Sequence, residues 1–147
     1  MTHEYVIALG GKIEPGESDQ NGIRPTAIAW AADHVLAVGR DDVVRSISRG
    51  DSTFLDLGGR VVTALPADPA RAEALVREQA LLKTPDLDIA ALLIEAELLD
   101  EDSALGPGSP AELAFWDTGG GLVAVVRSGA FTEGDEHRGP FPAASPK

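Results

Sequence analysis

The chain contains no cysteine among its 147 residues. This absence excludes disulfide bridges, thiolate metal ligands and a cysteine nucleophile. Basic residues are also scarce: 12 lysines and arginines stand against 24 aspartates and glutamates, which gives a formal net charge of −12. A negative field of this size repels phosphate backbones and anionic lipid headgroups, so we expect neither a nucleic-acid partner nor binding to a membrane surface.

Long hydrophobic runs are missing as well. No stretch approaches the ~20 apolar residues of a membrane span. The apolar run Tyr5–Leu9 ends at Gly10–Gly11 and follows no basic region, unlike a signal peptide. A length of 147 residues suits one domain with a hydrophobic core but is below the roughly 200 residues of the smallest (β/α)₈ barrels. We therefore expect a cytoplasmic protein with a single domain over residues 1–135.

The first 65 residues have the pattern of β structure. Short apolar runs at Tyr5–Leu9, Thr26–Ala32 and His34–Gly39 predict strands. The Gly- and Pro-rich segment Lys12–Arg24 predicts a loop or hairpin connection, and Ala32–Asp33 a tight turn. In the resulting hairpin, Ile28 and Trp30 would share a buried face with Val38 and either Val35 or Leu36.

A short helix and two further strands complete this half. Asp41 is a plausible N-cap for a helix over Asp41–Arg49, which Gly50 would end. Thr53–Leu57 and Arg60–Leu65 predict strands around the turn Gly58–Gly59.

Residues 68–100 predict a helical insert. Asp68 followed by Pro69 is a helix start signal, and Thr84–Pro85 repeats it before a second helix over Asp86–Leu99. In the first helix, which extends to Lys83, the expected buried stripe is Leu75, Val76, Gln79 and Leu82, and the expected outer residues are Arg71, Glu73, Arg77 and Glu78.

The last part of the chain returns to β structure within residues 104–132. Strands are expected at Glu112–Asp117, Leu122–Arg127 and Ala130–Thr132, with Gly119–Gly121 as the turn between the first two. Residues 136–147 are charged and Pro-rich and predict a loose tail.

Two segments resemble signature segments of the metal-dependent amidohydrolase superfamily. Thr53–Pro66 reads T-F-L-D-L-G-G-R-V-V-T-A-L-P, and Gly106–Asp117 reads G-P-G-S-P-A-E-L-A-F-W-D. The first is similar to the family's D-L-x-G-x-x-V-x-P-G strand pair, and the second to its return segment, with Glu112 where an aspartate is usual. The glycine pair after Val6–Leu9 and the stretch ending in A-V-G at Gly39 extend the resemblance to about 110 of the 147 positions.

The resemblance implies a particular fold. In that family the two segments form one small β-sandwich, the composite domain, beside a catalytic barrel. Here residues 67–105 alone separate them, so the barrel is absent. The expected fold is mainly β with α: a small sandwich built from the N- and C-terminal segments, with two central helices in place of the barrel.

Catalytic residues cannot be carried over from the family. Its metal-binding His-x-His pair should follow Leu65–Pro66, where this chain instead reads A-D-P-A-R-A-E-A. The three histidines, His3, His34 and His137, have no metal-ligand spacing. Glu133–His137 reads as a solvated tail rather than a cation site.

Other motifs are equally uninformative about chemistry. A calcium loop from Asp100 and Asp102 fails, because its glycine and final glutamate would fall on Leu105 and Ala111. The glycine pairs lack phosphate-loop spacing and read as turns. Trp30 and Trp116 are expected to pack between sheets, the alternative being an exposed binding aromatic. No catalytic, cofactor-binding or metal-binding residue is assigned, and no cofactor is implied.

Two functions follow as the main expectations, and a third, weaker one is a small-ligand binder that uses a pocket between the sheet and the helices. The first is a non-catalytic, stand-alone composite-type domain that acts as a binding or structural module, with a homodimer or a separate protein subunit as its partner. The alternative is a hydrolase acting on non-peptide carbon–nitrogen bonds, either vestigial or completed by a separate barrel subunit. Its only support is the resemblance, and a fold analogy is a weak basis for activity, so the sequence favours a protein that is not an enzyme.

Overall fold

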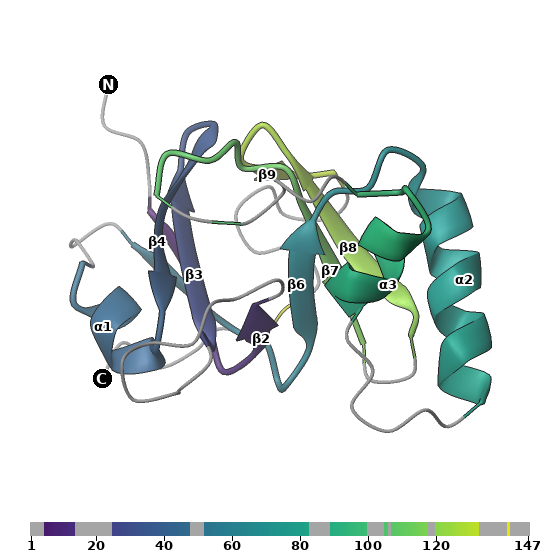
Figure 1. Ribbon diagram of the computed structural model, residues 1–147. Coiled ribbons are helices and arrows are strands. Elements are labelled where there is room, and N and C mark those ends of the chain that lie inside the picture. The colour runs from purple at the N-terminus through teal and green to yellow at the C-terminus, as the bar shows by residue number, and fades with distance from the viewer. Residues whose placement is uncertain are drawn as a thin grey trace.

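The chain folds into two β-sheets packed face to face, with helices on both outer sides (Figure 1). The computed structural model describes residues 5–13, 25–47, 52–82, 89–99, 105, 107–117, 120–132 and 141. Within these residues it contains a four-stranded sheet and a five-stranded sheet. The predicted mainly β sandwich with central helices is confirmed.

The four-stranded sheet comes entirely from the N-terminal half. Its strand order is β4 (His34–Gly39), β3 (Ala27–Ala31), β1 (Val6–Leu9) and β5 (Thr53–Asp56). Strand β3 pairs antiparallel with both β4 and β1, whereas β1 and β5 are parallel.

The five-stranded sheet joins the two ends of the sequence. Its order is β2 (Lys12–Ile13), β6 (Val61–Ala64), β7 (Leu113–Trp116), β8 (Leu122–Arg127) and β9 (Ala130–Phe131). The antiparallel pairing of β6 with β7 connects the N-terminal strands to the C-terminal ones. Strands from the first 65 residues and from 110–132 therefore share a sheet, as the resemblance implied.

The two glycine pairs carry the chain from one sheet to the other. Gly10–Gly11 lies between β1 and β2, and Gly58–Gly59 between β5 and β6, so the two crossings run side by side. The Gly59 amide donates to the Gly10 carbonyl at 2.7 Å. A methyl group at Gly11 would lie 2.7 Å from the Arg60 carbonyl oxygen, which explains the glycine there. The strands flanking Gly58–Gly59 thus belong to different sheets and form no hairpin.

The β3–β4 hairpin has the expected two-residue turn at Ala32–Asp33. Its register shifts after Ala29, because Trp30 pairs with Val35 while Ala29 pairs with Ala37. Leu36 is therefore the extra residue of a bulge. The sequence left Val35 and Leu36 as alternatives for the inner face, and Val35 is the residue that packs there with Ile28, Trp30 and Val38.

An aromatic cluster fills the space between the sheets. Trp30 lies with its ring centroid 6.2 Å from that of Phe115 and 6.0 Å from that of Phe131. Phe141 joins this cluster, 5.0 Å from Phe115. The prediction of a loose tail is therefore wrong at Phe141, which is 3% exposed.

Helix α1 (Asp41–Arg45) covers the outer face of the four-stranded sheet and buries Val44 against it. Asp41 is not its N-cap, because Arg40 occupies that position. The Asp41 carboxylate instead accepts hydrogen bonds from the Gly10 amide at 3.1 Å and from the Thr26 hydroxyl at 2.8 Å. These bonds tie α1 to the crossing after β1, a role that the local N-cap signal could not reveal.

Helices α2 (Pro69–Leu81) and α3 (Ile89–Glu95) lie on the outer side of the five-stranded sheet (Figure 1). Helix α3 ends earlier than expected, since Glu97 adopts a left-handed conformation with φ of 63°. No helix in the described part of the chain is long and apolar enough to cross a membrane.

Candidate functional site

The junction after β6 is the natural place to look for a site, because the resemblance puts the metal ligands there. The Leu65 amide donates to the Glu112 carbonyl at 2.9 Å, and the Ala67 amide donates to the Leu98 carbonyl at 3.2 Å. The second bond brings the two ends of the helical insert together. The chain thus leaves the sheet and returns to it at one place.

The first acidic residue after the junction has a structural task. Asp68 is the N-cap of α2, and its carboxylate accepts the Arg71 amide at 3.1 Å. Such a cap satisfies one of the backbone amides that the first helical turn leaves without a partner. The predicted start signal of Asp68 and Pro69 is therefore confirmed.

Helices α2 and α3, together called the helical cover below, bury an apolar patch on the outer face of the five-stranded sheet. The patch consists of Val61, Ala114 and Trp116. Ala72 and Val76 of α2 pack against this patch. Ile89 and Leu93 of α3 and the following Leu98 and Leu99 complete the cluster.

The two tryptophans occupy different cores. Trp30 packs between the sheets, as predicted, and its indole N–H donates to the Gly129 carbonyl at 3.0 Å. Trp116 is also fully buried, but on the opposite face of its sheet, beneath the helical cover. Its indole N–H donates to the Thr63 hydroxyl at 3.0 Å, and that hydroxyl donates to the Ala64 carbonyl. The expectation that Trp116 lies between sheets is wrong, because strand alternation puts Phe115 inward and Trp116 outward.

Glu73 of α2 provides a polar attachment between the cover and the sheet. Its carboxylate accepts the Leu122 amide of β8 at 2.7 Å and lies 3.3 Å from the Arg77 guanidinium. Glu73 was expected to face outward, yet its side chain is only 29% exposed. The helical periodicity of the sequence cannot predict a partner so far along the chain as the Leu122 amide at the start of β8.

The β7–β8 turn fits closely against α2. A methyl group at Gly120 would lie 3.0 Å from the Val76 carbonyl oxygen and 3.2 Å from the Ala80 side chain. Asp117 closes the turn by accepting the Gly121 amide at 2.8 Å. The two acidic side chains next to this turn, Asp117 and Glu73, therefore accept hydrogen bonds from backbone amides.

Glu112 also acts on backbone geometry. Its carboxylate accepts the Ser128 amide at 2.9 Å and so orders the β8–β9 turn. That turn contacts the β3–β4 hairpin across the sandwich, since a methyl group at Gly129 would lie 1.5 Å from the Ala32 carbonyl oxygen. Glu112 thus supports one of the contacts between the two sheets.

The histidines and acidic runs singled out in the sequence do not meet in the described residues. His34 begins β4, with Nδ1 3.7 Å from the Asp33 carboxylate, and both side chains are exposed. His3, His137, Glu133–His137 and the run Asp100–Asp102 lie outside the described residues. Within the described ranges no group of three or more His, Asp or Glu side chains could hold a metal ion.

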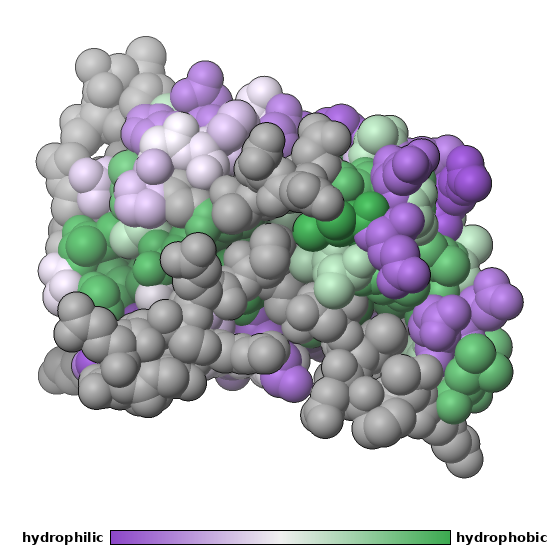
Figure 2. Space-filling model, viewed as in Figure 1, coloured by the Kyte–Doolittle hydropathy of each residue, from purple (hydrophilic) through white to green (hydrophobic). Residues whose placement is uncertain are grey.

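The C-terminal end of α2 exposes two leucines, one of which the sequence prediction placed wrongly. Leu82 was expected in the buried stripe but is 68% exposed, and Leu81 is 82% exposed. Figure 2 shows them as an apolar patch at the lower right, at the C-terminal end of α2. A rotation of 100° per residue puts Leu82 only about 20° from the half-buried Leu75, so the helical period predicts Leu82 on the inner side. The helix ends at Leu81, however, and Leu82 is its C-cap, which the period does not reveal.

Comparison with known proteins returns no relative: no family model and no curated protein matches the chain.

Proposed function

We propose that the chain is a non-catalytic binding or structural module, similar to an amidohydrolase composite domain in which a helical cover takes the place of the catalytic barrel. The observation that carries this proposal is the closure of the helical insert. Its two ends meet at the Ala67–Leu98 hydrogen bond, and its helices bury the apolar patch of Val61, Ala114 and Trp116.

The cover supports this role because it turns an apolar sheet face into an interior. Exposed apolar patches of this kind normally mark a surface that binds another domain. Here the chain supplies its own covering residues, Ala72, Val76 and Leu93, which are fully buried. The domain can then fold without a barrel beside it, and its acidic residues near the junction serve as caps and turn ligands.

Metal analysis of the purified chain tests the proposal. The protein is prepared without an affinity tag from cultures supplied with zinc, iron and manganese, and is passed through a desalting column. We expect well below one equivalent of any of these metals and no hydrolysis of non-peptide carbon–nitrogen bonds, such as those of cyclic imides and amides. A tightly bound stoichiometric metal, or turnover that a chelator abolishes, would refute the non-catalytic role.

A second, tagged preparation addresses the alternative of a hydrolase completed by a separate barrel subunit. A pull-down from the native host, with the tagged chain as bait, recovers such a subunit if it exists. Recovery of a barrel protein that contains a His-x-His pair, together with metal-dependent activity of the complex, would replace the proposed role with the enzymatic one.

A further inference from the structure

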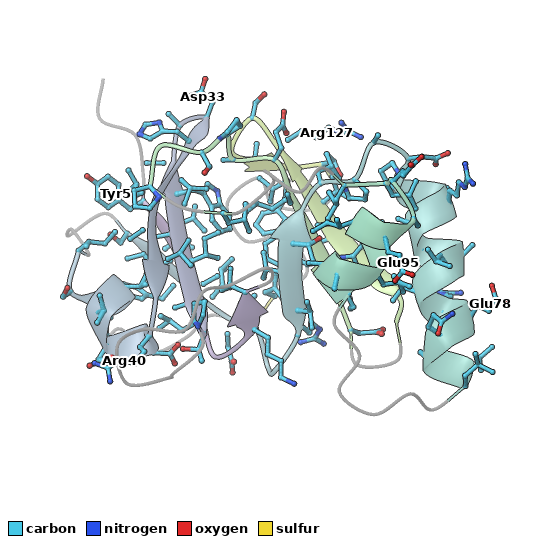
Figure 3. All side chains as sticks on the ribbon, in the orientation of Figure 1. Tyr5, Asp33, Arg40, Glu78, Glu95 and Arg127 are labelled. Carbon is cyan, nitrogen blue, oxygen red and sulfur yellow. The ribbon has the colours of Figure 1, made fainter. Side chains whose placement is uncertain are left out.

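One stripe of residues on α2 faces away from the sheets. It contains a small and a large apolar residue and a positive and a negative one. Ala74, Arg77, Glu78 and Leu81 are all exposed. Their spacing of three, four and seven positions puts them on one side of the helix. Figure 3 shows Glu78 on the side of α2 away from the sheets. We refer to these four residues as the α2 stripe.

The order of residues in the α2 stripe complements itself. If two α2 helices lie antiparallel about a two-fold axis between positions 77 and 78, Leu81 of each copy faces Ala74 of the other. The same axis puts Arg77 of each copy opposite Glu78 of the other. A closed two-fold contact requires a patch that matches its own copy in this way. We infer that the α2 stripe binds a second copy of this chain and forms an antiparallel, two-fold homodimer.

The charge of α2 does not oppose a second copy at this place. The whole chain carries a net charge of −12, so two copies repel each other over most of their surfaces. Helix α2 itself carries no net charge, because its two arginines, Arg71 and Arg77, balance its two glutamates, Glu73 and Glu78. Two copies can therefore approach along α2 without the repulsion that opposes contact elsewhere.

The apolar end of α2 supplies the buried area. Leu81 is the most exposed of the large hydrophobic residues in the described part of the chain, with an exposed fraction of 82%. Ala74 is small enough to let the helices approach closely where Leu81 of the other copy would lie. Pairing covers two leucines, one from each copy, that a single copy leaves in water.

The expected dimer is weak. A helix of 13 residues is about 20 Å long. Its contact with a second helix falls below the ~1,200 Å² of a standard stable interface, so we expect a dissociation constant on the order of 100 µM. This inference rests on the proposed module role, for which it names the partner.

Sedimentation velocity over a range of protein concentrations gives the first test. We expect a reversible monomer–dimer equilibrium for the natural chain. Glu78→Arg puts two arginines opposite each other and should weaken the dimer at least tenfold. The double change Arg77→Glu with Glu78→Arg restores opposite charges across the axis. It also replaces the Arg77–Glu73 ion pair with two carboxylates, so we expect it to recover the affinity only in part.

A matched control separates local charge from net charge. Glu95 of α3 is exposed and lies off the α2 stripe. Glu95→Arg changes the net charge as much as Glu78→Arg does and should leave the dimer intact or slightly tighter. Circular dichroism of each variant checks that the helices are retained.

A disulfide trap tests the register. The chain has no natural cysteine, so an introduced pair has no competitor. Within one helix, positions 74 and 81 are about 10 Å apart, beyond the ~7 Å limit for a disulfide. Ala74→Cys with Leu81→Cys should therefore give a covalent dimer on mild oxidation, whereas Leu81→Cys alone should not, because the axis keeps the two Leu81 positions equally far apart.

Several outcomes overturn the dimer. These are a chain that stays monomeric at millimolar concentration, a dimer that Glu78→Arg leaves unchanged, a double change that recovers none of the affinity, and crosslinking by Leu81→Cys alone. The metal analysis is independent of all four. A monomer without metal refutes only the dimer, and a dimer with a stoichiometric metal refutes only the non-catalytic role.

Discussion

The two faces of the five-stranded sheet support cores of different construction. The inner face meets the other sheet through an aromatic cluster that contains Trp30, Phe115 and Phe131. The outer face meets the helical cover mainly through aliphatic residues around Trp116. Both cores are buried, but different numbers of backbone contacts hold them closed.

Backbone contacts close the inner core at several places. Both glycine crossings link the sheets covalently, and the β3–β4 turn contacts Gly129 of the β8–β9 turn. The Ala111 amide also donates to Asp33, and the Gly129 amide donates to Ala111. Separating the sheets would break all of these contacts at once.

Helix α2 is held by far less. Of its thirteen residues, Ala72 and Val76 are buried, and Glu73 supplies one hydrogen bond to β8. An element with few buried apolar side chains opens at a lower free energy than the rest of its domain. The comparison therefore predicts that the cover opens as a unit while the sandwich stays folded.

The largest effect is expected at the contact between the two hairpin turns. Gly129→Ala places a methyl group 1.5 Å from the carbonyl oxygen of Ala32 and 2.7 Å from its carbonyl carbon. Both of these atoms belong to the backbone and cannot turn aside. The sheets must move apart to relieve this overlap, so we expect a loss of more than about 4 kcal/mol in the free energy of unfolding, or failure to fold. Urea unfolding followed by tryptophan fluorescence measures it.

Gly59→Ala is the matched control for this change. Gly59 has the same φ of 83°, yet a methyl group there would have no neighbour within 4 Å. Its replacement should cost only the ~1–2 kcal/mol of a left-handed alanine. Equal losses in the two variants would show that the turn contact does not hold the sheets together.

The second prediction compares two fully buried valines, one in each core. Val62 packs between the sheets, and Val76 of the helical cover packs against the outer face of the five-stranded sheet. Truncation of either to alanine should lower the free energy of global unfolding by about 2 kcal/mol, since each loses two methyl groups from a packed interior. Native-state hydrogen exchange should nevertheless distinguish them.

The distinction lies in the amides of α2. If the cover opens by itself, Val76→Ala lowers the opening free energy of these amides by the full amount. Val62→Ala leaves it unchanged, because Val62 stays buried in both the closed and the opened state. Identical exchange of α2 and the central strands in both variants would mean that the cover and the sandwich unfold as one unit.

The order of elements could be predicted from the sequence, because short-range signals determine it. Runs of apolar residues predicted the strands except β2, which begins the segment Lys12–Arg24 that was expected to be a loop or hairpin connection. Asp68 with Pro69 marked the start of α2, and Ala32–Asp33 marked a hairpin turn. The same signals carry no information on partners far along the chain. They could not show that Gly58–Gly59 crosses between sheets or that Phe141 enters the inner core.

The errors at the candidate site have the same origin. Glu73 looked like an outer residue because its acceptor role depends on an amide 49 positions away. Trp116 was assigned to the wrong core because the sequence does not tell which sheet face a helix will cover. Leu82 was assigned to the buried stripe because the helical period puts it close to Leu75, but α2 ends at Leu81 and Leu82 is its exposed C-cap.

The smallest predicted effect compares the two hairpin turns that meet across the sandwich, and it is a gain. Ala32 in the β3–β4 turn adopts a left-handed conformation with φ of 53°. In the β8–β9 turn the left-handed residues are Ser128 and Gly129, so that turn uses a glycine for one of them. Ala32→Gly removes the steric cost of this conformation, and part of the gain is lost to the greater freedom of glycine in the unfolded chain. We expect an increase of about 0.5–1 kcal/mol in the free energy of unfolding.

Ala37→Gly in the extended strand β4 is the control and should lower the free energy of unfolding by a similar amount. No gain from Ala32→Gly would mean that the Ala32 methyl group packs usefully at the turn contact, and the closure of the inner core would then depend on side chains as well as on backbone.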